Sequence, residues 1–165
     1  MNRTSVQWRH VAILATSAFV ALVFASGGAT AAALCRPVNG RFTLHAVAGP
    51  ECQSTVGVCA TGVYSGGISG HSTFTGSSLI PTVDTPTTGV LLLTGDSIFA
   101  TAHGTLMTKD AIVLKTTGAG DFAEVDVIVG GTHGWAGTTG QIRAQGTFTQ
   151  AAGGEGAYTG EVCSP

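Results

Sequence analysis

Glu124 and Asp126 are the side chains in this sequence whose type and spacing best suit acid–base chemistry. They lie two positions apart in a run that also carries Val125, Val127 and Val129. This period of two predicts a β-strand with the carboxylates on one face and the valines on the other. If the acidic face lined an apolar interior, burial would raise both pKa values and favour proton transfer. The valine face is the better core face, so we expect the valines to point inward and both carboxylates to be solvated.

Other residue types give weaker signals of chemistry. The histidines that follow the N-terminal segment are scattered without metal-ligand spacing: His45, His71, His103 and His133. The glycine-rich stretch 130–140 contains no lysine and precedes no predicted helix, so it lacks the features that bind phosphate. A G-x-S-x-G nucleophile motif is absent from the sequence. We therefore expect neither a metal nor a cofactor.

Four apolar side chains in predicted strands are candidates to line a ligand pocket: Phe42, Phe74, Phe99 and Leu106. A small barrel can enclose one small ligand. A pocket with a carboxylate at its floor would indicate ligand binding, whereas an interior filled to normal density would indicate a structural role.

The N-terminal segment has the pattern of a secretory signal peptide. Arg3 and Arg9 precede an apolar run over residues 11–25, and alanines at 31–33 provide a cleavage site. We expect removal of residues 1–33, which leaves 34–165 as one domain outside the cytoplasm, in the periplasm or medium. An uncleaved anchor is the alternative, although the run is short for a bilayer span. Lipid attachment at Cys35 is a third reading, which Leu34 disfavours.

The four cysteines all follow this leader, and an even number in an exported chain predicts disulfides. Three connectivities are open. We favour Cys52–Cys59, which are close in sequence, and Cys35–Cys163, which would tie the first strand to the last. The chain carries nine acidic and seven basic residues and no basic patch, so nucleic acid is an unsuitable partner.

Residues 34–165 show eight or so short alternating runs separated by turn signals, and no apolar pattern at helical spacing. This indicates an all-β domain, either a sandwich or a barrel. Turns are predicted at Gly95-Asp96, His103-Gly104 and Lys109-Asp110, and a loop at residues 81–88, which hold two prolines.

The run VIVGGTHGWAGTTGQIRA, residues 127–144, resembles the signature of the allene oxide cyclase and dirigent proteins. An apolar strand leads into Gly-Gly-Thr, then a connection with an aromatic residue, then a glycine that opens the next strand. The matching residues are Gly130, Gly131, Thr132, Trp135, Gly137, Gly140 and Gln141. Glu124, shortly before the two glycines, resembles the dirigent side. In the early segment, where these families carry catalytic carboxylates, Glu51 matches neither motif, so the families' catalytic residues do not carry over.

The resemblance implies a small antiparallel eight-stranded β-barrel of the calycin kind, often a homotrimer, that holds a small apolar molecule. If it is catalytic, the implied chemistry is the steering of a cyclisation or isomerisation without a cofactor. The alternative is a non-catalytic extracellular structural or interaction module, which the low aromatic content favours. The sequence leaves open whether the protein is an enzyme, and no membrane contact is expected once the leader is removed.

Overall fold

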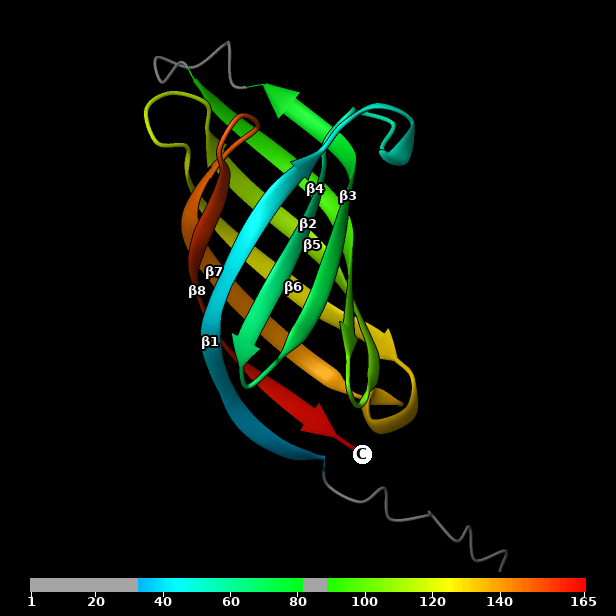
Figure 1. Ribbon diagram of the computed structural model, residues 1–165. Helices are drawn as coiled ribbons and strands as arrows, with labels where there is room; N and C mark the ends of the chain where they lie inside the picture. The colour runs from blue at the N-terminus through cyan, green and yellow to red at the C-terminus, as the bar shows by residue number, and fades with distance from the viewer. Residues whose placement is uncertain (1–32, 82–88) are drawn as a thin grey trace, which may run out of the picture. The chain divides into compact units, whose positions relative to one another are not determined.

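The computed structural model describes residues 33–81 and 89–165, which form a closed antiparallel barrel (Figure 1). Its strands are β1 (Leu34–Val47), β2 (Cys59–Gly66), β3 (Gly70–Pro81), β4 (Val90–Thr101), β5 (Gly104–Lys115), β6 (Asp121–Gly131), β7 (Thr139–Thr149) and β8 (Gly153–Ser164). Two 3-10 turns, η1 (Gly49–Glu51) and η2 (His133–Trp135), lie in the connections. The predicted eight-stranded all-β barrel is confirmed. The predicted signal peptide, apart from Ala33, and most of the predicted loop 81–88 lie outside the described residues.

Pairing of the first and last strands closes the barrel. Each strand pairs with its neighbour in sequence, and β1 also pairs with β8 from Leu34 opposite Ser164 to Leu44 opposite Gly154. Two disulfides have the predicted connectivity, Cys35–Cys163 across the β1–β8 ladder and Cys52–Cys59 beside β2. Closure pairs every described strand on both sides, which removes the open edges that promote aggregation.

Strands β4 and β5 run straight through two of the predicted turns, so those turn predictions are wrong. Gly95 pairs with Asp110 and Asp96 pairs with Lys109 in the middle of the β4–β5 ladder. Gly95 points inward, and a Cβ atom there would lie 2.3 Å from the ring of Phe74. The glycine therefore serves close packing of an aromatic ring and not chain reversal. Because β5 stays extended through Lys109 and Asp110, the Asp110 side chain faces the barrel interior and is buried.

The expected orientation of β6 is also wrong, because its valines face outward. Val125, Val127 and Val129 are 40%, 49% and 56% exposed, whereas Phe122 and Ile128 of the other face are buried. Those two larger side chains fill the barrel on either side of the carboxylates, so packing of the bulky residues sets the inward face. Both carboxylates of this strand therefore lie inside.

One half of the interior is packed with apolar side chains. It lies toward the β2–β3 and β4–β5 turns and η2, at the lower end in Figure 1. The packed residues include Val38, Ile68, Phe99, Leu106, Ile128, Trp135, Ile142 and Val162. The Tyr158 hydroxyl accepts a hydrogen bond from the Ile68 N–H at 2.7 Å, and the Trp135 indole donates to Thr101 Oγ1 at 2.8 Å. These hydrogen bonds satisfy the polar atoms of the two large aromatic side chains that close this end of the barrel.

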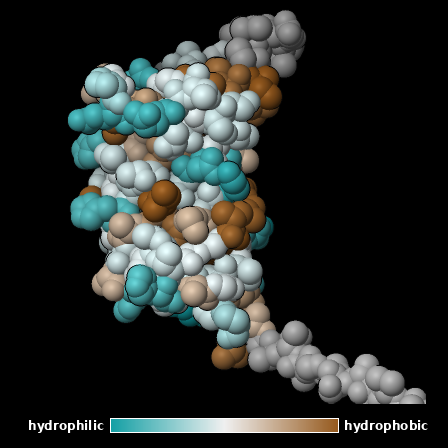
Figure 2. All heavy atoms as spheres, turned by 90° about the vertical axis from the view of Figure 1, so that its right-hand side faces the viewer, coloured by the Kyte–Doolittle hydropathy of each residue, from teal (hydrophilic) through white to brown (hydrophobic). Residues whose placement is uncertain are grey.

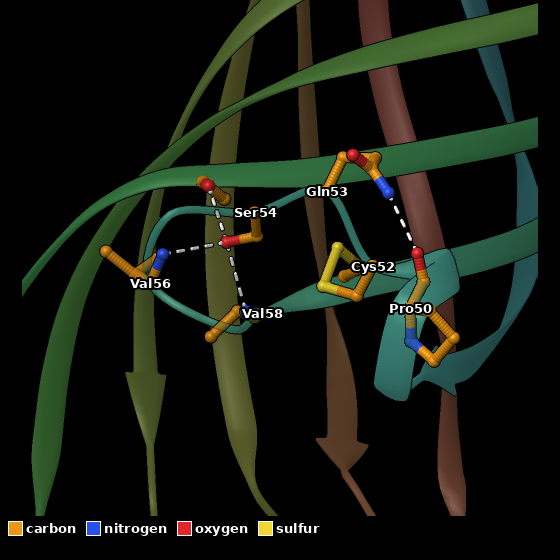
Figure 3. The surroundings of a disulfide bond; sticks show 8 residues. Pro50, Cys52, Gln53, Ser54, Val56 and Val58 are labelled. Carbon is orange, nitrogen blue, oxygen red and sulfur yellow. Dashed lines mark hydrogen bonds between the residues drawn. A yellow bond between two sulfur atoms is a disulfide. The ribbon is translucent and has the colours of Figure 1, made fainter.

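The opposite end is bordered by the β1–β2 connection, which is fixed by Cys52–Cys59 and by Ser54 (Figure 3). Ser54 Oγ donates to the Gly76 carbonyl at 2.6 Å and accepts from two backbone N–H groups, including that of Val58 at 3.1 Å. These contacts hold the connection against β3. Val58 is thereby positioned over the barrel interior.

An apolar outer face covers β3 to β6. Its exposed members are Ile80, Leu92, Ile98, Met107, Val113, Val125, Val127 and Val129. Strand pairing places them side by side, since Leu92 lies opposite both Ile80 and Val113, and Ile98 lies opposite Met107. Figure 2 shows apolar side chains in several places among polar ones on one side of the barrel.

Candidate functional site

A pocket of about 60 Å³ lies inside the barrel near the β1–β2 connection. Most of its wall is hydrocarbon, from Leu44, Val58, Ala60, Phe74, Leu93, Ile112, Leu114, Phe122 and Phe148. Its polar lining consists of Tyr64, Ser72, Ser97 and Glu124. This space is large enough for a few water molecules or for the polar end of a small ligand.

Strand alternation places the polar lining deeper than the apolar lining. Along β6, Phe122 comes before Glu124, and along β4, Leu93 comes before Ser97, counting from the pocket end of each strand. The pocket is therefore an apolar cup with a polar floor. Such an arrangement fits a ligand with a hydrocarbon body and one polar end.

Three carboxylates meet at this floor, Asp110 from β5 and Glu124 and Asp126 from β6. Asp110 and Asp126 are direct partners across the β5–β6 ladder, and one oxygen from each of the three residues lies within 4.8 Å of the others. Asp110 and Asp126 are only 3% and 2% exposed. Glu124 is the member that lines the pocket, so a ligand would meet this carboxyl group first.

The hydrogen bonds of the three acids differ. Asp110 accepts from Ser97 Oγ at 2.6 Å and from Thr108 Oγ1 at 2.5 Å, one bond on each carboxylate oxygen. Asp126 forms a hydrogen bond with Glu124, but its Oδ1 atom is buried without any partner. Because a buried polar atom without a partner costs free energy, this oxygen marks a place where the described residues leave the site unsatisfied.

Burial raises the pKa of all three carboxyl groups. Loss of hydration raises the pKa of Glu124 to about 8, with a further contribution from the charge of Asp110. Loss of hydration, then the charges of Glu124 and Asp110, raise the pKa of Asp126 to about 10. For Asp110, burial raises the pKa while the hydroxyls of Ser97 and Thr108 oppose the rise. At neutral pH Asp126 therefore keeps its proton, and Glu124 exchanges its proton in the range where a general acid or base is effective.

No cation compensates these acids from within the described part of the barrel. Every described Lys, Arg and His is exposed on the outside. Lys109, the neighbour of Asp110 in sequence, points outward and pairs with Asp96. Buried carboxylates without a cationic partner normally hold a proton or bind a cation from solution.

The predicted site residues fall in two places. Glu124 and Asp126 are together at the floor, against the expectation that they would be solvated, and Phe74 lines the pocket. Phe42, Phe99 and Leu106 are buried in the core and do not line the pocket. Phe42 still touches its wall, since its ring lies 5.9 Å from that of Phe122.

Asp110 is the candidate site residue that the sequence prediction missed. Because Lys109-Asp110 was predicted to be a turn, Asp110 was not assigned to either face of a strand. The signal that identifies it is the alternation of Leu106, Thr108, Asp110 and Ile112, which continues through the supposed turn. This alternation places Asp110 on the same face as the apolar residues.

The three carboxylates offer oxygen ligands, which hard cations prefer, but they offer too few of them. Ca²⁺ takes six to eight oxygens and Mg²⁺ keeps several waters in an octahedral shell. Here three carboxylates adjoin a wall made mostly of hydrocarbon, and both oxygens of Asp110 already accept hydroxyl hydrogen bonds. The site therefore fits acid–base chemistry better than metal binding.

Fold and site together define a small closed β-barrel with an internal apolar pocket floored by buried acids. No protein-family model, no curated protein and no solved structure matches the chain. Within the described residues, no helix is long and apolar enough to cross a membrane.

Proposed function

We propose that the barrel binds a small apolar molecule in this pocket and moves a proton within it, steering an isomerisation or cyclisation without a cofactor. The observation that carries the proposal is the contact of Glu124 with an apolar pocket, backed by two further buried acids. A carboxyl group with a pKa of about 8 serves as a general base or acid near neutral pH.

The roles of the two acids of β6 follow from their positions. Glu124, in the pocket wall, takes a proton from one carbon of the ligand and returns it to another, so that no oxidant or reductant is required. Asp126 keeps its own proton and donates a hydrogen bond to Glu124, which stabilises the carboxylate form of Glu124. The apolar walls hold the ligand in one folded shape, which selects the product.

A small β,γ-unsaturated ketone tests this chemistry, because its conversion to the conjugated isomer is followed by ultraviolet absorbance. We expect conversion with a rate maximum between about pH 8 and pH 10, where Glu124 is ionised and Asp126 is protonated. Glu124→Gln should lower the rate by roughly 10²- to 10⁴-fold, the usual contribution of general acid–base catalysis.

The matched control is Glu155→Gln, which changes an exposed carboxylate of β8 and should leave the rate unaltered. Equal rates for wild type and Glu124→Gln would overturn the proposal. So would an equal loss in the control.

The disulfides also bear on where the protein is located. Two disulfides indicate a non-reducing environment, as outside the cytoplasm. We infer that the predicted signal peptide exports the chain, so the ligand would be a molecule of the periplasm or medium.

The apolar outer face favours self-association as a second property. Patches of exposed apolar side chains that exceed the usual scatter mark interaction surfaces. Asp96 and Lys109 form an ion pair within this face, so each copy offers both signs of charge to a neighbouring copy. We propose a homo-oligomer through this face, which the family resemblance puts at a trimer.

Light scattering of the purified protein should then give a mass above that of one chain. Val127→Lys places a charge in the middle of the face and should shift the mass to the monomer. Thr159→Lys, an equivalent change on the exposed side of β8, should leave the oligomer intact. A monomeric wild type would contradict self-association.

A further inference from the structure

The acidic floor of the pocket also limits which ligands can reach it. Three carboxylates lie together there, and the described interior holds no cationic side chain to offset them. Asp126 adds a second, independent observation, since it is 2% exposed and its Oδ1 has no hydrogen-bond partner. The described residues therefore leave a hydrogen-bond acceptor unsatisfied in the acidic cluster, of which Glu124 is the member that lines the pocket.

We infer that the pocket selects a primary amine with a narrow apolar body, whose ammonium group sits against Glu124 and whose hydrocarbon lies along the apolar wall. This inference shares the pocket with the proposed function but not its chemistry, because it requires an ion pair and no reaction. It assigns the chemical class of the ligand.

Comparison of possible polar head groups supports an ammonium. A carboxylate or phosphate would bring a second negative charge against ionised Glu124 and would be repelled. Ionised carboxylates only accept hydrogen bonds, and an ammonium supplies three donors and no acceptor. A quaternary ammonium lacks these N–H donors, and a guanidinium spreads its charge over a planar group, whereas a primary ammonium concentrates its charge on one nitrogen. A primary ammonium is positively charged, supplies three N–H donors and concentrates its charge on one nitrogen.

The aromatic part of the wall adds to the attraction. Rings of Tyr64, Phe74, Phe122 and Phe148 line the pocket. Aromatic faces attract cations, and the attraction grows when the cation is removed from water. These rings also provide the hydrocarbon surface that the body of the ligand needs.

Binding of an ammonium should release a proton. Facing Glu124 are Asp110 of β5, Asp126 of β6 and Tyr64 of β2, and burial together with these acids raises the pKa of Tyr64, so its hydroxyl stays neutral. An ammonium pairs with ionised Glu124, which must first lose the proton it holds below its pKa of about 8. An aliphatic amine, like Lys with a pKa of about 10.4, keeps its charge over this range. Affinity should therefore rise roughly tenfold per pH unit between pH 6 and pH 8.

The experiment compares hexylamine, hexanol and hexanoate by calorimetry in buffers of different ionisation enthalpy. We expect hexylamine to bind at least about tenfold more tightly than hexanol at pH 8, because the alcohol leaves the charge unpaired, and to release roughly half a proton, because Glu124 is about half ionised at this pH. Hexanoate should be weaker than either. Equal affinities for amine and alcohol, or no binding of hexylamine to the wild type, would overturn the inference.

Substitutions of acidic residues test whether Glu124 causes the preference for the amine. Glu124→Gln should abolish both the preference for the amine and the proton release, while Glu155→Gln retains both. If Glu124→Gln does not fold, Asp126→Asn serves instead and should reduce the preference, because it removes part of the acidic cluster. An unchanged preference in the folded variant would overturn the inference.

The ketone assay on the same samples separates the two proposals. Isomerisation without a preference for the amine overturns only the ligand class. Amine binding without isomerisation overturns only the proposed catalytic function.

Discussion

Thermal unfolding of the protein should occur at a midpoint roughly 10 °C higher near pH 5 than near pH 9. The reason is the raised pKa of Glu124, to about 8, and of Asp126, to about 10. A carboxyl group whose pKa is higher in the folded state binds more protons there than in the unfolded chain. Stability is therefore greatest below the unfolded pKa and is lost as pH rises toward the folded value.

The size of the effect follows from the same linkage. One pKa unit corresponds to about 1.4 kcal/mol, and the window extends from 4.5 to about 8 for Glu124 and from 3.8 to about 10 for Asp126. Partial hydration at high pH reduces the full value, so we expect a loss on the order of 3 kcal/mol between pH 5 and pH 9. Calorimetry or circular dichroism at a series of pH values measures it.

Variants at the floor should flatten this dependence. Glu124→Gln keeps the shape of the protonated side chain but cannot ionise, so the midpoint should be little changed at pH 5 and higher than wild type at pH 9. Asp121→Asn is the matched control on the same strand. Its carboxylate is exposed and 3.8 Å from Lys115, so the wild-type dependence should persist.

A midpoint that is constant or rises from pH 5 to pH 9 would show that the acids are hydrated in the folded protein. The expected result, greater stability of Glu124→Gln at high pH, would show that the carboxylate lowers the stability of the folded protein. Such a cost is typical of residues kept for function.

Removal of the Cys35–Cys163 disulfide should have the largest effect on stability of any change at the ends of the described chain. The two cysteines are 128 residues apart in sequence and lie opposite each other in the ladder that closes the barrel. On the chain-entropy model, cross-linking so long a loop stabilises by about 5 kcal/mol. The double change Cys35→Ser and Cys163→Ser should therefore lower the unfolding midpoint by roughly 15 °C.

The second disulfide provides an internal comparison. Cys52 and Cys59 are separated by 7 residues, for which the same model gives about 2.5 kcal/mol. Replacing this pair by serines should cost about half as much as replacing the first pair. Equal losses would show that contacts in the folded β1–β2 connection, and not loop entropy, dominate the effect. The pocket would then depend on Cys52–Cys59, because this disulfide and Ser54 fix the connection that carries Val58.

The local pattern of the chain was sufficient for the class of fold. Alternation with a period of two, frequent glycine turns and the cysteine positions led to an all-β domain with the observed disulfide pairs, while the choice of a barrel over a sandwich came from the family resemblance. These features depend on neighbouring residues and on chain ends, which a sequence displays directly. The same pattern identified Glu124 and Asp126 as a pair on one face of a strand.

Only the tertiary structure decided which face of that strand is inside. Alternation defines two faces but not their direction, and the valines were the more apolar choice. In the closed barrel the bulky Phe122 and Ile128 fill the interior, and the small valines lie on the apolar outer face.

The position of Asp110 inside the barrel was likewise decided only by the tertiary structure. It was assigned to a turn because Lys109-Asp110 is a common turn pair, whereas pairing of β4 with β5 keeps the strand extended through it. Register between β5 and β6 then sets Asp110 against Asp126. The acidic floor is thus a product of cross-strand pairing, because its members come from two strands and converge only when β5 and β6 pair in this register.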